Sequence, residues 1–325
     1  MRRMLSGVVA GVVVAFCLVG SLLFALHRPT PHEVPVGLVA PDPVATQISQ
    51  TLASRAPDAF TITRYGDAAA AERAVRERTV AGAFVADPGG PLLLVAGANG
   101  GITRQVLEAA FGPLAQRTGG TLTVQDLVPL PDADRSGAST FFFVVGVMVA
   151  SLVAGIALGI GGAPRWQQAA GWVLAAAAVG GTATWTAAGL VGALPGHGVA
   201  LFGVAALASA AIAGTALALV RLLGPAGAPV AALVLVVLGM PATGGPAGPD
   251  FLPAAYRWLA DVLPTGAAVD LVRRVVYFGG HGIGHGTLVL AAWVAGAALL
   301  LAATALRRPA TPAHRRTDLS AALYR

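Results

Sequence analysis

The sequence contains no lysine, since all 21 of its Lys and Arg residues are arginine. This absence excludes a P-loop, whose lysine contacts the nucleotide phosphates, and it excludes a Schiff-base lysine. Cys17 is the only cysteine, so the chain cannot form an intrachain disulfide. No H-E-x-x-H, G-x-S-x-G or G-x-G-x-x-G motif is present. We therefore expect no catalytic residue, no metal, no cofactor and no enzymatic activity.

Charged residues are scarce and unevenly placed. They make up 11% of the 325 residues, whereas roughly 25% is usual in a globular domain. Between Ser139 and Pro249 the only formal charges are Arg165 and Arg221, while residues 27–138 are charged like a soluble domain. A chain that is also 56% hydrophobic is therefore predicted to be a multi-pass α-helical membrane protein with one aqueous domain.

Six apolar runs predict six transmembrane helices. The first, Leu5–Leu26, covers roughly 33 Å, which is enough for the ~30 Å hydrocarbon core, and we interpret it as an uncleaved signal anchor. Arginines gather in the short segments between and after these runs that would be cytoplasmic, and the short outer loop around PGHG has none. This bias predicts that both termini lie in the cytoplasm of a plasma-membrane protein, and it accounts for much of the positive charge without a nucleic-acid partner. The remaining runs are Ser139–Gly161, Trp166–Leu194, Gly198–Leu222, Ala226–Met240 and Gly284–Leu306.

The predicted organisation has six parts in chain order. They are a cytoplasmic start with the anchor helix (1–26), an extracytoplasmic α/β domain (27–138), transmembrane helices 2–5 (139–245), an extracytoplasmic amphipathic or re-entrant segment (246–283), transmembrane helix 6 (284–306) and a cytoplasmic tail (307–325).

Alternating apolar and helical patterns predict the elements of the α/β domain. Asp67 is a suitable N-cap for the second helix. Asp132 and Asp134 lie in a proline-flanked linker and are expected to be solvated. The expected strands are 33–40, 59–66, 79–86, 90–97 and 122–130, and the expected helices are 43–56, 67–78 and 102–117.

The segment before the last apolar run combines a short span with an amphipathic helix. The fifth run covers only about 22 Å before Pro241, and such an interrupted run is typical of a broken helix near a transport pathway. The stretch LPTGAAVDLVRRVVYFGG then predicts a helix that starts after Pro264 and ends at its glycines. Its apolar face carries valines and a leucine, and we expect its charged face to lie in water, where an exposed ion pair contributes only roughly 0.3–0.5 kcal/mol.

We interpret this segment as an outer collar, and two roles remain open for it. The charges of its Asp and Arg residues sum to zero, so they could pair with one another and be purely structural, or they could guide a cargo through a gate. The histidines of HGIGH are expected to be loop residues, since glycines interrupt the pair and no third metal ligand is near. The residues assigned to the collar or gate are Pro241, Pro253, Asp261, Pro264, Asp270, Arg273, Arg274 and Tyr277.

Two stretches resemble the type-2 ABC exporter permeases, and within them the phage-infection-protein branch. One comprises VPVGLVAPD and AAAAERAVRERTVAGAFVADP in the α/β domain, and the other is GPAGPDFLPAAYRWLADVLPTGAAVDLVRRVVYFGG. The resemblance implies a homodimeric or paired permease that exports a hydrophobic or amphipathic cargo with a separate ATPase subunit. It also implies that the loop containing Arg165, Trp166 and Gln167 would couple to the ATPase. The alternative is a non-transporting surface protein, anchored by its bundle, whose outer domain binds a ligand, a phage or a secretion partner.

The topology can be tested with single cysteines in a Cys17→Ala background. A cysteine at position 54 should react with an impermeant thiol reagent in intact cells, whereas a cysteine at position 320 should react only after the membrane is opened, because the arginine asymmetry places it inside. Labelling of position 320 in intact cells would overturn this orientation. The native residues at both positions are serines.

Overall fold

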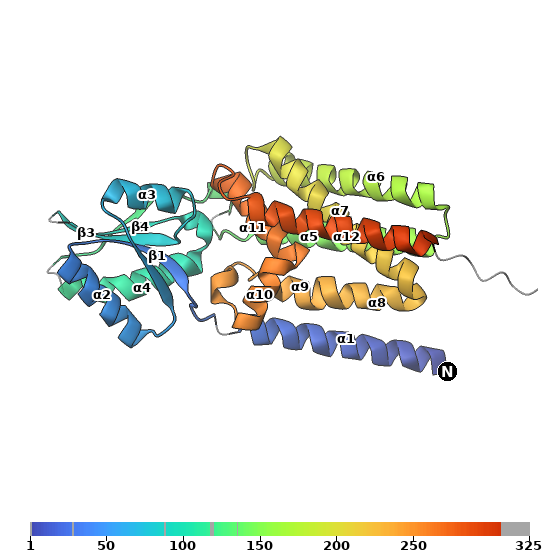
Figure 1. Ribbon diagram of the computed structural model, residues 1–325, viewed down its shortest axis with the longest axis horizontal. Helices are drawn as coiled ribbons and strands as arrows, with labels where there is room; N and C mark the ends of the chain where they lie inside the picture. Colours follow the sequence, from blue (N-terminus) through green and yellow to red (C-terminus); the bar gives the residue numbers. More distant parts are fainter. Residues whose placement is uncertain (1, 28, 88, 118–119, 135, 307–325) are drawn as a thin grey trace, which may run out of the picture.

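The computed structural model describes residues 2–27, 29–87, 89–117, 120–134 and 136–306. Figure 1 shows an α/β domain at one end of an elongated helical bundle. The amino-terminal helix starts at the far end of that bundle, where the last helix also finishes.

The α/β domain is a five-stranded sheet with helices on both faces. Strand order is β2-β1-β3-β4-β5, and every neighbouring pair is parallel except the β3–β4 hairpin. Helices α2 and α4 bury Ile48, Leu52, Leu107 and Phe111 against one face of the sheet, and α3 packs on the other face. The elements are β1 (Val34–Val39), α2 (Asp42–Arg55), β2 (Phe60–Arg64), α3 (Ala68–Arg76), β3 (Gly82–Asp87), β4 (Gly90–Val95), α4 (Gly101–Arg117) and β5 (Thr123–Asp126).

These elements lie where the hydrophobic patterns predict five strands and three helices. The predicted N-cap is confirmed, because the carboxylate of Asp67 accepts a hydrogen bond from the backbone N–H of Ala70 at 2.7 Å. Local side-chain chemistry therefore determines where α3 begins.

The rest of the described chain is helical. Two short π-helical segments continue these helices, one directly after α6 (Trp185–Leu190) and one directly after α8 (Leu233–Leu238). The helices are α1 (Arg2–Leu26), α5 (Ser139–Ile160), α6 (Arg165–Thr184), α7 (Gly198–Leu223), α8 (Gly227–Ala232), α9 (Gly239–Ala242), α10 (Ala254–Val262), α11 (Pro264–Tyr277) and α12 (Gly284–Leu306).

Four helical runs of the described chain are long and apolar enough to cross a membrane. They are Ser139–Ile160, Arg165–Leu190, Gly198–Ala242 and Gly284–Thr304, and Val12–Leu26 is a shorter apolar helix. The run Gly198–Ala242 reverses direction at Gly224, whose φ is +62°. Because of this reversal Gly227 contacts the carbonyl of Leu219, so α7 and α8 pack side by side.

The helix that the sequence pattern predicts to break near Pro241 extends one residue beyond it. Helix α9 continues to Ala242, and the chain turns only afterwards. Proline has no N–H to bond the carbonyl four residues earlier, which here belongs to Val237. The hydroxyl of Ser21 on α1 donates to that carbonyl at 2.7 Å, so a neighbouring helix replaces the missing bond.

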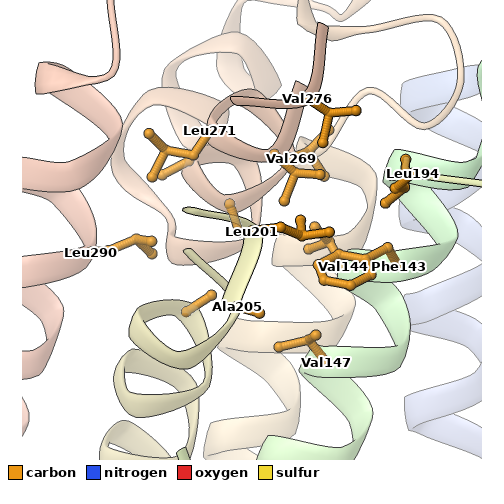
Figure 2. Close-up of a cluster of buried hydrophobic side chains, with 14 of the residues drawn as sticks. Phe143, Val144, Val147, Leu194, Leu201, Ala205, Val269, Leu271, Val276 and Leu290 are labelled. Carbon is orange, nitrogen blue, oxygen red and sulfur yellow. The ribbon is translucent and has the colours of Figure 1, made fainter. Parts of the chain in front are cut away.

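Helix α7 is the centre of the bundle and packs against α5, α6 and α12. Small residues allow the backbones to approach closely: Gly155 of α5 lies against Ala213, and Gly180 of α6 lies against Ala206. Ser151 of α5 adds a hydrogen bond to Ser209 at 2.8 Å. Figure 2 shows apolar side chains of α5, α7, α11 and α12 meeting in one buried cluster, and Figure 1 shows α11 at the end of the bundle nearer the α/β domain.

A methyl group added at Gly155 should destabilise this packing. Its Cβ would overlap the carbonyl of Ala213 and lie 2.9 Å from the Cβ of Ala216. We expect Gly155→Ala to lower the free energy of unfolding by about 1–3 kcal/mol in a thermal unfolding assay in detergent.

Gly146→Ala on the same helix is the matched control. A Cβ there meets nothing within 4 Å, so the change should be neutral or stabilising. Equal losses for the two variants would contradict close packing of α5 on α7.

Candidate functional site

Helix α11 lies between the bundle and the α/β domain. Pro264 occupies its first turn, and Gly279 and Gly280, with φ of +60° and +79°, turn the chain away after Tyr277. The predicted apolar face is confirmed, since Leu271, Val272 and Val276 are buried with residues of α5, α7 and α12 (Figure 2).

The charged face of α11 is covered, and the expectation that it lies in water is wrong. Arg273 is only 2% exposed, and Asp270 and Arg274 are partly buried. The reason is that the α/β domain lies on this face and brings Arg78 to it. The patterns within α11 do not reveal a partner so far away in the chain.

Arg78 connects the domain to α11 through several groups. Its backbone has a φ of +57° in the turn after α3. Its Nε donates to the Oδ1 of Asn99 at 3.0 Å, and its Nη1 donates to the Oδ1 of Asp270 at 2.5 Å. The guanidinium also lies 5.5 Å from the ring centroid of Phe278, within cation–π range.

Asp270 is held from two sides. Besides Arg78, it accepts a hydrogen bond from the Nε of Arg274 at 2.8 Å, as the i,i+4 spacing of the two residues on α11 allows. Arg274 also donates to the carbonyl of His281 at 3.0 Å. Burial alone would raise the pKa of Asp270, but the charges of Arg78 and Arg274 outweigh it and hold the pKa below its usual range.

Two further ionisable groups lie close to this pair. Burial lowers the pKa of Arg273 to about 10, with the like charge of Arg78 acting in the same direction, so the guanidinium stays protonated at neutral pH. Burial raises the pKa of Asp250, although Arg78, Arg273 and Arg257 oppose that shift. We call Arg78, Asp250, Asp270, Arg273 and Arg274 the junction cluster.

The junction cluster surrounds two small cavities of about 170 and 190 Å³. Both cavities are lined by Arg78, Asp270, Arg273 and Arg274. The larger one continues under the α/β domain, and the smaller one continues between α10 and the start of α12. The junction therefore encloses polar space.

Tyr277 points to another part of the domain. Its hydroxyl lies 3.5 Å from the Oδ2 of Asp134, and burial together with the charge of Asp134 raises the pKa of Tyr277. Asp134 is buried and accepts hydrogen bonds from the backbone N–H groups of Ala138 and Ser139 at the start of α5. The expectation of a solvated Asp134 is therefore wrong, because this carboxylate caps a helix.

The remaining collar residues frame the junction. Pro241 is buried in α9, Pro253 immediately precedes α10, and Pro264 starts α11. Asp261 is exposed at the mouth of the smaller cavity, where its carbonyl lies 3.3 Å from the Nε2 of His285.

The charges of the segment do not pair only with one another. Arg257 of α10 lies 3.5 Å from the carboxylate of Glu33, and Asp270 binds Arg78. Glu33 and Arg78 both belong to the α/β domain, so the idea of a self-paired collar is wrong. The residues of these contacts that the sequence patterns do not assign to the site are Arg78, Asn99 and Glu33, and no local signal in the sequence marks them as partners of this segment.

The predicted ATPase-coupling residues lie at the opposite end of the bundle (Figure 1). Arg165 begins α6, and its Nη2 donates to the carbonyl of Thr304 at 3.2 Å. Trp166 is 70% exposed, and Gln167 is also exposed. Arg221 lines the same surface hollow as Arg165.

The chain folds into a bundle of long apolar helices that carries an α/β domain. This arrangement identifies the chain as a multi-pass membrane protein. A family model described as ABC-2 family transporter protein matches residues 2–306, and the chain belongs to this family. No curated protein and no solved structure matches the chain. Among the described residues no group of three or more His, Cys, Asp or Glu side chains is arranged to hold a metal ion.

Breaking the Arg78–Asp270 pair should destabilise the protein more than breaking an exposed pair. Exposed pairs contribute roughly 0–1 kcal/mol, whereas removing one partner of a buried pair costs about 3–5 kcal/mol. Because the Arg78–Asp270 pair is partly buried, we expect a coupling energy of about 1–3 kcal/mol from a double-mutant cycle with Arg78→Ala and Asp270→Ala, measured by thermal unfolding in detergent.

The exposed i,i+4 pair Arg104–Glu108 is the control. Its coupling energy in the same assay should stay below about 0.5 kcal/mol. A junction coupling as small as that of the control would show that the contact between the domain and α11 contributes nothing.

Proposed function

We propose that this chain is the permease subunit of a type-2 ABC exporter in the plasma membrane. The observation that carries the proposal is the family match over residues 2–306. Residues 1–325 contain no lysine and therefore no P-loop, and the proposal assigns ATP hydrolysis to a separate ATPase subunit. Assignment to the phage-infection-protein branch belongs to the same proposal.

The proposed topology has six spans, with both termini cytoplasmic and the α/β domain outside. The reversal at Gly224 supports counting α7 and the α8–α9 arm as separate spans. Arg165 and Arg221 lie at the end of the bundle where α1 begins, opposite the α/β domain (Figure 1). This separation agrees with the positive-inside rule for short loops.

A hydrophobic or amphipathic cargo is the class that the bundle favours. A groove of about 560 Å³ lies between α5 and α6, and phenylalanine, valine, leucine and alanine side chains line most of it. Polar groups are few along it, among them Ser139, Thr182 and Thr186. Such a groove suits an alkyl or aromatic group and gives a charged solute no partner.

The proposal includes that this chain works as a homodimer or as one of two paired permease subunits. The exposed apolar side chains of α5 and α6, for example Phe142, Val153 and Val173, provide surface for lipid or for a second copy. Gly- and Ala-rich helices of this kind pack closely against one another. Crosslinking in native membranes should therefore yield a dimer as well as the monomer.

The α5–α6 loop provides the sharpest test of this proposal. Trp166→Ala combined with Gln167→Ala should reduce recovery of an ATP-hydrolysing partner on purification from native membranes by at least about tenfold, because an exposed tryptophan at an interface commonly contributes 2 kcal/mol or more. The level of the permease itself should not change.

Trp258→Ala is the matched control, since Trp258 is 64% exposed on α10 at the opposite end of the bundle. It should leave recovery of the ATPase unchanged. If no ATPase accompanies the wild-type chain, the proposal fails, and the result favours an anchored surface protein whose outer domain binds a ligand, a phage or a secretion partner.

A further inference from the structure

Arg273 is a buried charge that lacks a full set of partners. It is 2% exposed, and its Nη2 has no hydrogen-bond partner among the described residues. Asp270, one turn away, uses its two carboxylate oxygens for Arg78 and Arg274. A buried guanidinium without a partner is costly, so a negatively charged or strongly accepting group is needed opposite it.

The space next to Arg273 is large enough for such a group. Arg273 lines both cavities of the junction, and the larger one, of about 190 Å³, also reaches Asn99 and Thr103. That volume corresponds to roughly six waters of the bulk liquid. It therefore accommodates a small tetrahedral anion together with some water.

The wall opposite α11 also favours a negative charge. Helix α4 begins at Gly101, and Asn99 and Thr103 on either side of that position line the larger cavity. The first N–H groups of a helix have no acceptor within the helix, and the helix dipole places partial positive charge at this end. Thr103 in the first turn of α4 and Arg273 thus line the same cavity from different parts of the chain.

The balance of formal charge points the same way. The larger cavity is lined by Arg78, Arg273 and Arg274 together with Asp250 and Asp270, which leaves an excess of one positive charge there even when both carboxylates are ionised. Arg78 and Arg274 hold Asp270, so Asp250, the other carboxylate that lines the larger cavity with Arg273, is the one left to compete with an added anion.

We propose that the larger cavity is a binding site for a phosphate group, with Arg273 as its principal ligand and the start of α4 as a second donor. The phosphate belongs either to the head group of a lipid-like amphiphile or to free inorganic phosphate. The smaller cavity shares Arg78, Asp270, Arg273 and Arg274 with the larger one, and its lining also includes Asp261 and His285, which are both exposed. A position of this site at the outer membrane interface rests on the proposed function, whereas the binding chemistry does not.

The site can be tested by calorimetric titration of the purified full-length protein in a non-ionic detergent. One titration uses inorganic phosphate, with chloride at matched ionic strength as its control. The other uses short-chain phosphatidic acid below its critical micelle concentration, with a diacylglycerol of the same chain length as its control. Saturable binding of phosphatidic acid alone identifies a lipid-type head group, and saturable binding of inorganic phosphate as well identifies a site open to the free ion.

Three variants locate the binding in the cavity. Arg273→Met should weaken it by at least about tenfold, since a hydrogen bond to a charged group is worth about 1.5–3 kcal/mol. Arg64→Met, which removes an exposed arginine of the α/β domain outside both cavities, should leave it unchanged. Asp250→Asn removes the competing carboxylate and should tighten it several-fold, so the test remains decisive if Arg273→Met does not fold.

The proposal is overturned if neither probe binds the wild type more strongly than its control, in which case the cavity holds water only. It is also overturned if Asp250→Asn fails to tighten binding or if Arg273→Met binds as the wild type does. These titrations need no ATPase, so they can succeed or fail independently of the export proposal.

Discussion

The arrangement of this molecule depends on Asp270, whose carboxylate binds one arginine from the α/β domain and one from its own helix. The same segment makes two more contacts of this kind, between Arg257 and Glu33 and between Tyr277 and the buried Asp134. All three connect residues 250–277 to the domain or to the linker that leads from it into α5. Such directional contacts fix the domain in one orientation, which apolar packing alone specifies weakly.

Local chemistry made much of the fold predictable. The strands and helices of the α/β domain follow from apolar periodicity, and Asp67 caps α3 as its position indicates. The Asp270–Arg274 pair follows from its spacing on one helix turn. In these cases the partners lie within a few residues of one another, so the sequence contains the whole interaction.

The burial of the charged face of α11 was not predictable in this way. An amphipathic pattern shows that a helix has two different surroundings, but it does not show whether the polar side faces water or another polar surface. Arg78 is separated from Asp270 by 192 residues, and Asp134 lies 143 residues before Tyr277. Pro241 illustrates the same limit, because the hydroxyl that replaces its missing hydrogen bond comes from Ser21. None of these features can be predicted before the tertiary arrangement of the chain is known.

The stability of the junction does not require a charged residue at position 273. The apolar face of α11 already binds the helix to α5, α7 and α12, and the Asp270–Arg78 pair already binds it to the domain. A buried ion without full hydrogen bonding is commonly replaced by an apolar side chain of similar size with no loss of stability, or with a gain. A helix selected only to join the two parts would therefore carry an apolar residue at this position. Because the rest of the bundle is so poor in charge, an arginine that breaks the local rule is best explained by something that occupies the space in front of it.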